Sequence, residues 1–265
     1  MFHGMKNTIL YTAYKLYCEY EKNSSDKIQT VGTCFVVESK YRHPCVITNI
    51  HLIIPSFSNK KYVGYKLINA RLVGKKDTDG FKGDAKVNQE IDLRTELFVF
   101  PENELVDVSA CPLIIKKEKY QVMEYHVPFN LIANEKFINE LEICDFIPIP
   151  GFPEWHDREA DRPIMRVGNI TSDQRLNYKV KNKFMGDVIL YDGFSYPGNS
   201  GSPVFSFQRG IKGTPQFPVS GFRELALIGI NAGHYSTERG DHPGLSYFYR
   251  STDFLKLIDA EIIFE

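Results

Sequence analysis

The chain has 265 residues, of which 43% are hydrophobic and 25% are charged, and its formal net charge is -1. This composition is typical of a globular protein with enough apolar residues for a sizeable core. The near-neutral charge argues against a dedicated nucleic-acid-binding protein, which usually carries a strong basic excess. Every apolar run is shorter than the roughly 20 residues of a transmembrane helix, so we expect no membrane association.

The cysteines indicate a reducing environment. Their odd number and irregular spacing differ from a disulfide framework, which favours free thiols and a cytoplasmic protein. No Cys-x-x-Cys pair or zinc-like Cys/His spacing occurs, and we expect no metal and no cofactor. No secretory signal is expected either, because Lys15 interrupts the first apolar stretch and no small-residue cleavage site follows it. The cysteines are Cys18, Cys34, Cys45, Cys111 and Cys144.

The N-terminal segment, residues 1–22, is predicted to contain an amphipathic helix, because its apolar residues recur at helical spacing. From residue 28 onward, short runs of β-branched and aromatic residues alternate with turn residues. This pattern is typical of an all-β barrel or sandwich and not of alternating strands and helices. The predicted strands are 30–37, 44–50, 96–100, 106–115, 146–152, 163–170, 187–191, 202–207, 225–232 and 245–249.

Two β lobes are predicted, at residues 28–115 and 144–250. The segment 116–143 between them is less strand-like, so we interpret it as the connection between the lobes, with a short helix near residues 134–141. The end of the chain, 251–265, is predicted to form a helix, since apolar residues gather on one side of it. Ser251 or Thr252 is the expected N-cap of that helix.

A glycine-framed serine stands out in the stretch YPGNSGSPVF, residues 196–205. A surface turn is the simpler interpretation of Ser200, and a nucleophile held in a tight backbone loop is the alternative. A serine hydroxyl is a weak nucleophile at neutral pH. It needs a base within hydrogen-bond reach, and that base needs an orienting partner.

His51 and Asp107 are the best candidates for these partners. His51 is the one histidine of seven that directly follows a strong β run, in CVITNIHLII, although a lone histidine there is more commonly a core residue. Asp107 opens an otherwise apolar strand, where a buried charge requires a partner such as a histidine N–H. The competing Asp92 has charged neighbours and is expected to be exposed to solvent.

The order His51, Asp107, Ser200 resembles that of the trypsin-like (chymotrypsin-fold) serine peptidases. The stretches TCFVV, CVITNIHLI, VDVSACPLI, FIPIPGFP, DGFSYPGNSGSPVF and LIGINAG with GLSYFY look like successive blocks of that family, over roughly residues 30–258. The disulfide-poor bacterial group similar to HtrA proteases is the nearest kind. HtrA proteins commonly carry a PDZ domain, which is not expected in this chain.

The resemblance implies two six-stranded antiparallel β-barrels of the chymotrypsin type, with an N-terminal and a C-terminal helix. It implies a serine endopeptidase that acts on a protein or peptide through an acyl-enzyme intermediate. Ser200 would be the nucleophile, His51 the general base and then acid, and Asp107 the group that orients the imidazole. The backbone N–H groups of Gly198 and Ser200 would form the oxyanion hole. Ser202 departs from the family, which usually has a second glycine there.

Substrate recognition is less defined by the resemblance. The strand residues Ile230, Asn231, Ala232 and Gly233 would pair with an extended substrate backbone. Phe194 stands where trypsin carries the acid that selects Lys or Arg, so a basic preference is not supported and a small or apolar side chain is expected. His234, which follows the strand, is either a pocket residue or an exposed turn histidine.

Two other functions fit the same residues. A pseudoprotease would keep the fold as a peptide- or protein-binding module, although it would need neither the three catalytic residues nor Gly198. An esterase-type acyl hydrolase shares the chemistry up to the acyl-enzyme. A cytoplasmic protease also needs restraint, so a regulatory protein partner or an incompletely formed oxyanion loop is a further hypothesis. The charged segment 151–163 is interpreted as a surface loop in preference to a metal site.

Overall fold

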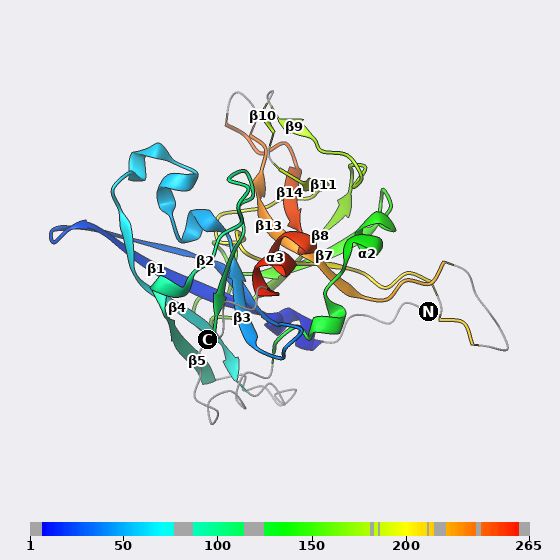
Figure 1. Cartoon of the computed structure of the whole chain (residues 1–265), viewed down its shortest axis with the longest axis horizontal. Helices are drawn as coiled ribbons and strands as arrows, with labels where there is room; N and C mark the ends of the chain where they lie inside the picture. The colour runs from blue at the N-terminus through cyan, green and yellow to red at the C-terminus, as the bar shows by residue number, and fades with distance from the viewer. Residues whose placement is uncertain are drawn as a thin grey trace.

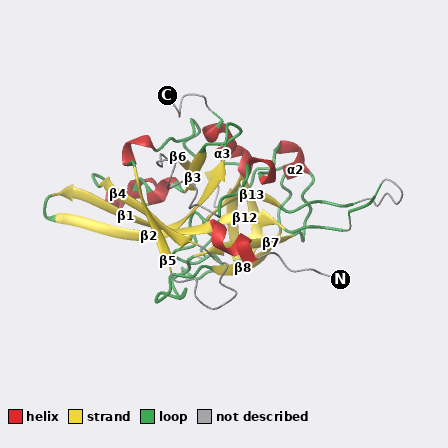
Figure 2. Cartoon of the chain, turned by 90° about the horizontal axis from the view of Figure 1, so that it is seen from below, coloured by secondary structure: helices red, strands yellow, loops and turns green. Residues whose placement is uncertain are grey.

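The computed structural model describes residues 7–76, 87–113, 125–180, 183–184, 186–210, 212–214, 221–236 and 240–259. Most of its regular structure consists of strands in two six-stranded antiparallel sheets (Figure 1). The sheets lie side by side, and the helices are short (Figure 2). The predicted all-β class with two six-stranded antiparallel units is therefore confirmed.

The first sheet has the strand order β5-β4-β1-β2-β3-β6. Strands β1 and β2 form a long hairpin that extends away from the second sheet (Figure 1). From Leu16 onward, alternate residues of β1 point into the core, so one face of the hairpin is buried and the other is partly exposed to solvent. The strands are β1 Ala13–Asn23, β2 Asp26–Glu38, β3 Pro44–Thr48, β4 Lys66–Lys76, β5 Val87–Leu93 and β6 Ser109–Pro112.

The second sheet has the order β12-β13-β14-β11-β8-β7. Its two edge strands meet, because Phe207 N–H, just after β12, donates a hydrogen bond of 3.1 Å to the carbonyl oxygen of Phe146 in β7. This contact closes the sheet into a barrel. A two-residue hairpin, β9 Lys179–Val180 and β10 Lys183–Phe184, lies outside it. The strands are β7 Phe146–Gly151, β8 Ile164–Ile170, β11 Val188–Asp192, β12 Pro203–Ser206, β13 Ala226–His234 and β14 Leu245–Arg250.

The predicted N-terminal helix is wrong. A short 3-10 helix, η1 Asn7–Thr12, is followed at once by strand β1, and the first sheet therefore begins at Ala13, well before residue 28. The physical reason is that buried residues recur at every second position of this segment, which is the spacing of a strand and not of a helix. Tyr14, Leu16, Cys18 and Tyr20 alternate with polar residues and are all buried, which a strand satisfies and a helix does not.

Other local predictions have mixed outcomes. The predicted strand 96–100 is wrong, because a 3-10 helix occupies its start and a single β-bridge joins Val99 to Ala110. The predicted strand 106–115 shortens to β6, and residues 114 and 115 lie outside the described part. Helix α2, Glu135–Asn139, confirms the short helix of the connection, where Asn134 caps the first turn. The other 3-10 helices are η2 Ile50–Leu52, η3 Pro55–Phe57, η4 Lys60–Tyr62, η5 Thr95–Leu97 and η6 Phe129–Leu131.

Helix α3, Ser251–Ile258, joins the two sheets. Its N-cap is Arg250 and not the predicted Ser251 or Thr252. The Ser251 hydroxyl instead donates to the carbonyl of Ala133, which ties the helix to the inter-barrel connection. Phe254 packs edge-on against Phe35 of β2, inside a core cluster that draws side chains from both sheets. None of the described helices is long and apolar enough to cross a membrane.

Candidate active site

Asp107 and His51 form a tight pair. The His51 ring nitrogen Nδ1 lies 2.5 Å from Asp107 Oδ2, and the His51 backbone N–H donates to Asp107 Oδ1 at 2.9 Å. Both side chains are largely buried. Each carboxylate oxygen therefore accepts one hydrogen bond from the same residue, which fixes both the position and the orientation of the imidazole.

The local backbone explains why these two residues meet. Strand β3 ends at Thr48, and the chain turns into the 3-10 helix η2, which carries His51. Thr48 pairs with Ser109 in β6, so the segment that enters β6 passes beside η2. The buried Asn49 side chain donates to the carbonyl oxygen of Asp107 at 2.6 Å and clamps the two segments together. Sequence reasoning missed this role of Asn49, although an amide beside the candidate base was a usable signal.

The loop that carries Ser200 belongs to the second sheet but is anchored to the first. Thr33 N–H in β2 donates to the carbonyl oxygen of Ser200 at 2.8 Å. The Thr33 hydroxyl donates to the carbonyl oxygen of Gly198 at 2.6 Å and accepts from Phe152 N–H at 3.2 Å. Thr48, three residues before His51, donates its hydroxyl to the Thr33 carbonyl. These bonds bring Ser200 beside the His51–Asp107 pair, and Thr33 is a positioning residue that the sequence did not reveal.

Two backbone N–H groups of this loop point to no acceptor. Asn199 N–H and Gly201 N–H donate to the carbonyls of Tyr196 and Asn231, whereas Gly198 N–H and Ser200 N–H have no hydrogen bond to any described residue. The carbonyl oxygen of Pro197 accepts from Glu154 N–H at 3.0 Å. Because a trans peptide directs its C=O and N–H oppositely, the Gly198 N–H points away from that neighbouring loop.

Gly198 is required by the shape of the loop. Its φ is +93°, a conformation that residues with a Cβ rarely adopt. An added Cβ would also collide with the carbonyl oxygen of Phe152. The position therefore has both a conformational and a steric reason for glycine, at the residue whose free N–H faces the site.

The Ser200 hydroxyl forms no hydrogen bond with His51 in this structure. Its hydrogen-bond partner among the described residues is the carbonyl oxygen of Ala232, at 3.5 Å, which is a long and weak contact. The structure thus joins two of the three predicted catalytic side chains directly and brings the third beside them through backbone contacts.

Strand β13 presents an open edge next to Ser200. Its pairing with β12 ends at Ile230, while its pairing with β14 continues to His234 through a bulge at Ala232. The Asn231 backbone still bonds the serine loop through Gly201 and Ser202, so the free edge consists of Ala232, Gly233 and His234.

The predicted substrate-binding residues differ in exposure. Ile230 and Asn231 are fully buried, and the Asn231 amide donates to the Ser195 hydroxyl and the Asn199 carbonyl. These two side chains support the site from inside the barrel. Phe194 is 45% exposed and is the most accessible of the predicted set.

Two histidines border the region between Phe194 and the end of β13. The rings of His234 and His242 stack with centroids 4.1 Å apart, and Phe194 lies 4.8 Å from His242. Ser195 N–H donates to His242 Nε2 at 3.1 Å. Burial lowers the pKa of both imidazoles, which favours neutral rings. His234 is thus a half-buried residue of this region and not an exposed turn histidine.

Ser202, the departure from the glycine-rich pattern, is fully buried. Its Oγ occupies the space that a Cβ on Gly151 would need, so a glycine in β7 makes room for the extra side chain. The charged segment 151–163 is a loop whose Asp161 pairs with Lys15 of β1 at 2.6 Å. It borders a cavity of about 400 Å³ beside Gly198, lined also by Phe152 and Arg158.

Comparison with known proteins gives structural matches only. No protein-family model and no curated protein matches the sequence. The HtrA-type protease AlgW, solved with a decapeptide, aligns with a TM-score of 0.56 and 14% identity over 97% of this chain and 66% of that one. The chain thus spans just under two thirds of the AlgW chain. A thermostable serine protease, AL20 from an extremophilic microorganism, aligns with a TM-score of 0.57 and 13% identity over 95% of this chain and 97% of that one. The fold of this chain is therefore the trypsin-like double barrel of the HtrA and related serine proteases.

Proposed function

We propose that this protein is a serine endopeptidase that hydrolyses peptide bonds through an acyl-enzyme intermediate. The observation that carries the proposal is the His51–Asp107 pair beside a serine loop whose Gly198 and Ser200 N–H groups are free. A purely structural histidine–carboxylate pair has no need of free N–H donors beside it. The serine-protease fold of the structural neighbours agrees with this reading.

In the proposed mechanism, rotation about the Ser200 Cα–Cβ bond takes the hydroxyl from the Ala232 carbonyl toward His51 Nε2. The hydroxyl oxygen attacks the substrate carbonyl carbon while Nε2 accepts the proton. Asp107 holds the ring with Nδ1 toward itself and stabilises the imidazolium that results. The N–H groups of Gly198 and Ser200 donate to the oxyanion, and each such donor is worth about 3 kcal/mol of transition-state stabilisation.

Collapse of the tetrahedral intermediate breaks the C–N bond, and His51 passes its proton to the departing amine. Water then attacks the acyl-enzyme with the same histidine as base, which releases the acid and restores Ser200. The free edge of β13 supports a peptide substrate, since Ala232, Gly233 and His234 offer backbone groups to an extended chain. The five cysteines form no disulfide, which agrees with the proposed cytoplasmic location.

The proposal is tested by labelling with a fluorophosphonate probe, which reacts covalently with an activated serine. We expect the folded wild type to be labelled at Ser200, and both Ser200→Ala and His51→Ala to lose labelling. Ser202→Ala is the matched control, because this serine lies two residues away but is fully buried. It should still be labelled.

Peptide libraries and simple esters then separate the hydrolase classes. Cleavage of internal peptide bonds supports the endopeptidase, and hydrolysis of esters alone supports the esterase alternative. The contact of Ser200 with Ala232 in place of His51 favours the third possibility, a pseudoprotease that binds peptides. A wild type that is folded by circular dichroism and remains unlabelled would support that binding module and refute the enzyme.

A further inference from the structure

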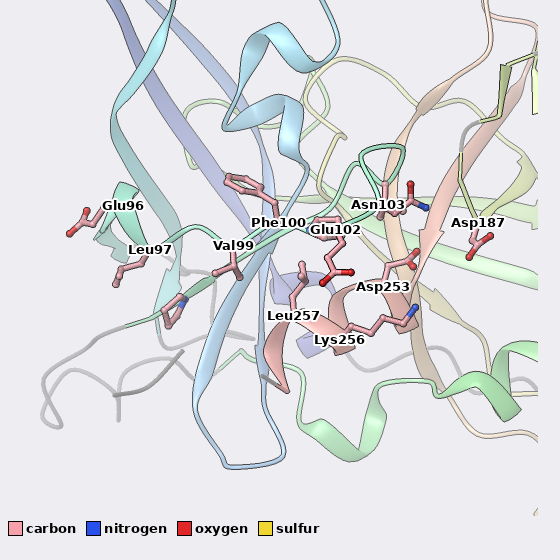
Figure 3. Close-up of a pocket in the computed structure, with 13 residues that line it drawn as sticks. Glu96, Leu97, Val99, Phe100, Glu102, Asn103, Asp187, Asp253, Lys256 and Leu257 are labelled. Atoms are coloured by element: carbon pink, nitrogen blue, oxygen red, sulfur yellow. The ribbon is translucent and has the colours of Figure 1, made fainter. Parts of the chain in front are cut away.

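A second cavity lies away from the serine loop, between helix α3 and the segment that leads to Asp107. Its volume is about 670 Å³. One wall is the segment 96–106, which connects β5 to β6, and the other consists of one face of α3 and Asp187, just before β11 (Figure 3). The cavity thus spans the junction between the two barrels.

One end of the cavity is acidic. Glu102, Asp187 and Asp253 line this part of the cavity, and Asp187 is close enough to Asp253 to act on its charge (Figure 3). Asp253 is only 6% exposed, and its buried Oδ2 has no hydrogen-bond partner among the described residues. Burial raises the pKa of this carboxyl to about 6, and the charge of Asp187 adds to the effect. A desolvated carboxylate oxygen that no protein group satisfies favours a positively charged ligand.

The protein's own cations leave this oxygen unpaired. Lys256 extends from the next turn of α3 but forms no ion pair within 4 Å in the described part of the chain. The buried Arg250 guanidinium donates instead to the carbonyl oxygen of Gln174 at 2.6 Å. Three carboxylates therefore face one exposed ammonium group, and the end of the cavity keeps a negative excess.

The remainder of the lining is apolar. Val99, Phe100 and Val106 line it from the segment 96–106, which has little regular structure, and Leu257 lines it from α3. A ligand that fits both ends carries a cationic group at one end and a hydrophobic body at the other. Inorganic cations lack that body, and no group of three or more metal-ligating side chains occurs among the described residues.

We propose that this cavity binds a small organic cation, with a primary ammonium or guanidinium group against Asp253 and an apolar stem against Phe100 and Leu257. The site is separate from the proposed catalytic centre, yet its wall ends at Val106, the residue before Asp107. The Tyr249 hydroxyl donates to the Leu105 carbonyl at 2.9 Å and fixes the same segment. A bound cation therefore contacts the stretch of chain that sets the position of the His51 partner.

Calorimetric titration with 4-phenylbutylamine tests the site directly, with 4-phenylbutanol as the neutral probe of the same shape. At pH 8 we expect the full chain to bind the amine at least tenfold more tightly than the alcohol. Asp253→Asn should weaken amine binding by about tenfold or more and leave alcohol binding unchanged, because it removes only the charge. Phe100→Ala should weaken both probes, and Lys256→Met should strengthen amine binding.

Asp92→Asn, an exposed carboxylate on β5, is the control variant and should bind the amine like the wild type. Equal affinity for amine and alcohol, or an unchanged amine affinity in folded Asp253→Asn, would overturn the proposal. Binding is measured without any hydrolysis, so this result is independent of the proposed peptidase activity. The link to Asp107 does rest on that activity: saturating amine should alter the rate of fluorophosphonate labelling at least twofold, and an unchanged rate in a protein that binds the amine would refute the link alone.

Discussion

Asp107 and Asp253 are two carboxylates with almost the same burial and opposite surroundings. Asp107 is 7% exposed and Asp253 is 6% exposed. Both oxygens of Asp107 accept hydrogen bonds from His51, at 2.9 Å and 2.5 Å. Asp253 keeps a buried oxygen with no partner, and its pKa is raised to about 6. Burial by itself therefore does not distinguish the two, and the hydrogen-bond partners do.

The two carboxylates differ because the surrounding chain provides hydrogen-bond donors to Asp107 but leaves one oxygen of Asp253 without a donor among the described residues. At Asp107 the partner lies on η2, which the Asn49 clamp holds against the approach to β6. At Asp253 the helix α3 packs its apolar residues into the inter-barrel core and carries the carboxylate inward with them. In the first arrangement two hydrogen bonds from His51 hold the carboxylate and fix the orientation of the imidazole. In the second arrangement, burial destabilises the charged form of Asp253, and binding of a proton or a cation would relieve that cost.

The largest effect is expected from Asp107→Asn. The amide would offer an N–H to His51 Nδ1, which favours the wrong tautomer while the shape of the site is kept. We expect fluorophosphonate labelling and peptide cleavage to slow by about 10⁴-fold. Rates of labelling at fixed probe concentration measure the change.

Asp253→Asn is the matched control for this experiment, since it makes the same chemical change at the same degree of burial. Its labelling rate without added ligand should stay within about twofold of the wild type. If the two variants lose activity equally, the distinction between a paired catalytic carboxylate and an unpaired one fails.

Gly198→Ala tests whether the Asp107–His51 pair suffices without the serine loop. The substitution leaves that pair intact but forces a Cβ against the Phe152 carbonyl, so the free N–H group must move. Loss of one oxyanion donor predicts a fall in kcat of about 10²- to 10³-fold. Gly221→Ala is the control, because Gly221 also has a positive φ, +80°, but an added Cβ there meets nothing within 4 Å. Equal losses in both variants would mean that backbone strain and not the collision is responsible.

The chain order and the local settings of His51, Asp107 and Ser200 predicted the histidine–aspartate contact, and the resemblance to trypsin-like peptidases that they support implied the double barrel. The β run before His51 is recognisable in the sequence because it is a short continuous stretch of apolar and β-branched residues, and Cys45 to Thr48 are all buried. Strand β1 was read as a helix, since the aromatic residues on both its faces also match a helical spacing. Strand β4, which pairs with β1, and strand β5, which pairs with β4, were not predicted, because charged and amide residues such as Lys66, Asn69 and Glu90 interrupt their apolar pattern.

Contacts that depend on tertiary packing were beyond the sequence. Thr33 bridges Gly198 and Phe152, which are more than 100 residues away along the chain, and nothing local distinguishes it from other strand threonines. The space that Gly151 leaves for Ser202 is likewise set by two strands that meet only in the fold. The unpaired oxygen of Asp253 was hidden for the same reason, because a carboxylate near the start of a helix looks like an ordinary favourable residue.

The smallest expected effect is on stability, through Asp253→Asn. The pKa of Asp253 is higher in the folded protein, about 6, than its ordinary value of 3.8, so the folded state binds the proton more tightly than the unfolded state. The wild type therefore loses stability as pH rises from about 4 to about 6 and does not regain it above. Asp187 raises the pKa further, while Lys256 and Arg250 oppose it.

Removing the Asp253 carboxylate should stabilise the protein at pH 8 by up to about 3 kcal/mol and change its stability little at pH 4. Urea unfolding at the two pH values measures this difference. Asp173→Asn is the opposite control, because the partly buried carboxyl of Asp173 has a pKa lowered to about 2 by Arg175, and its loss should slightly destabilise the protein at pH 8. An equal change at both pH values for Asp253→Asn would show that packing and not charge governs the site.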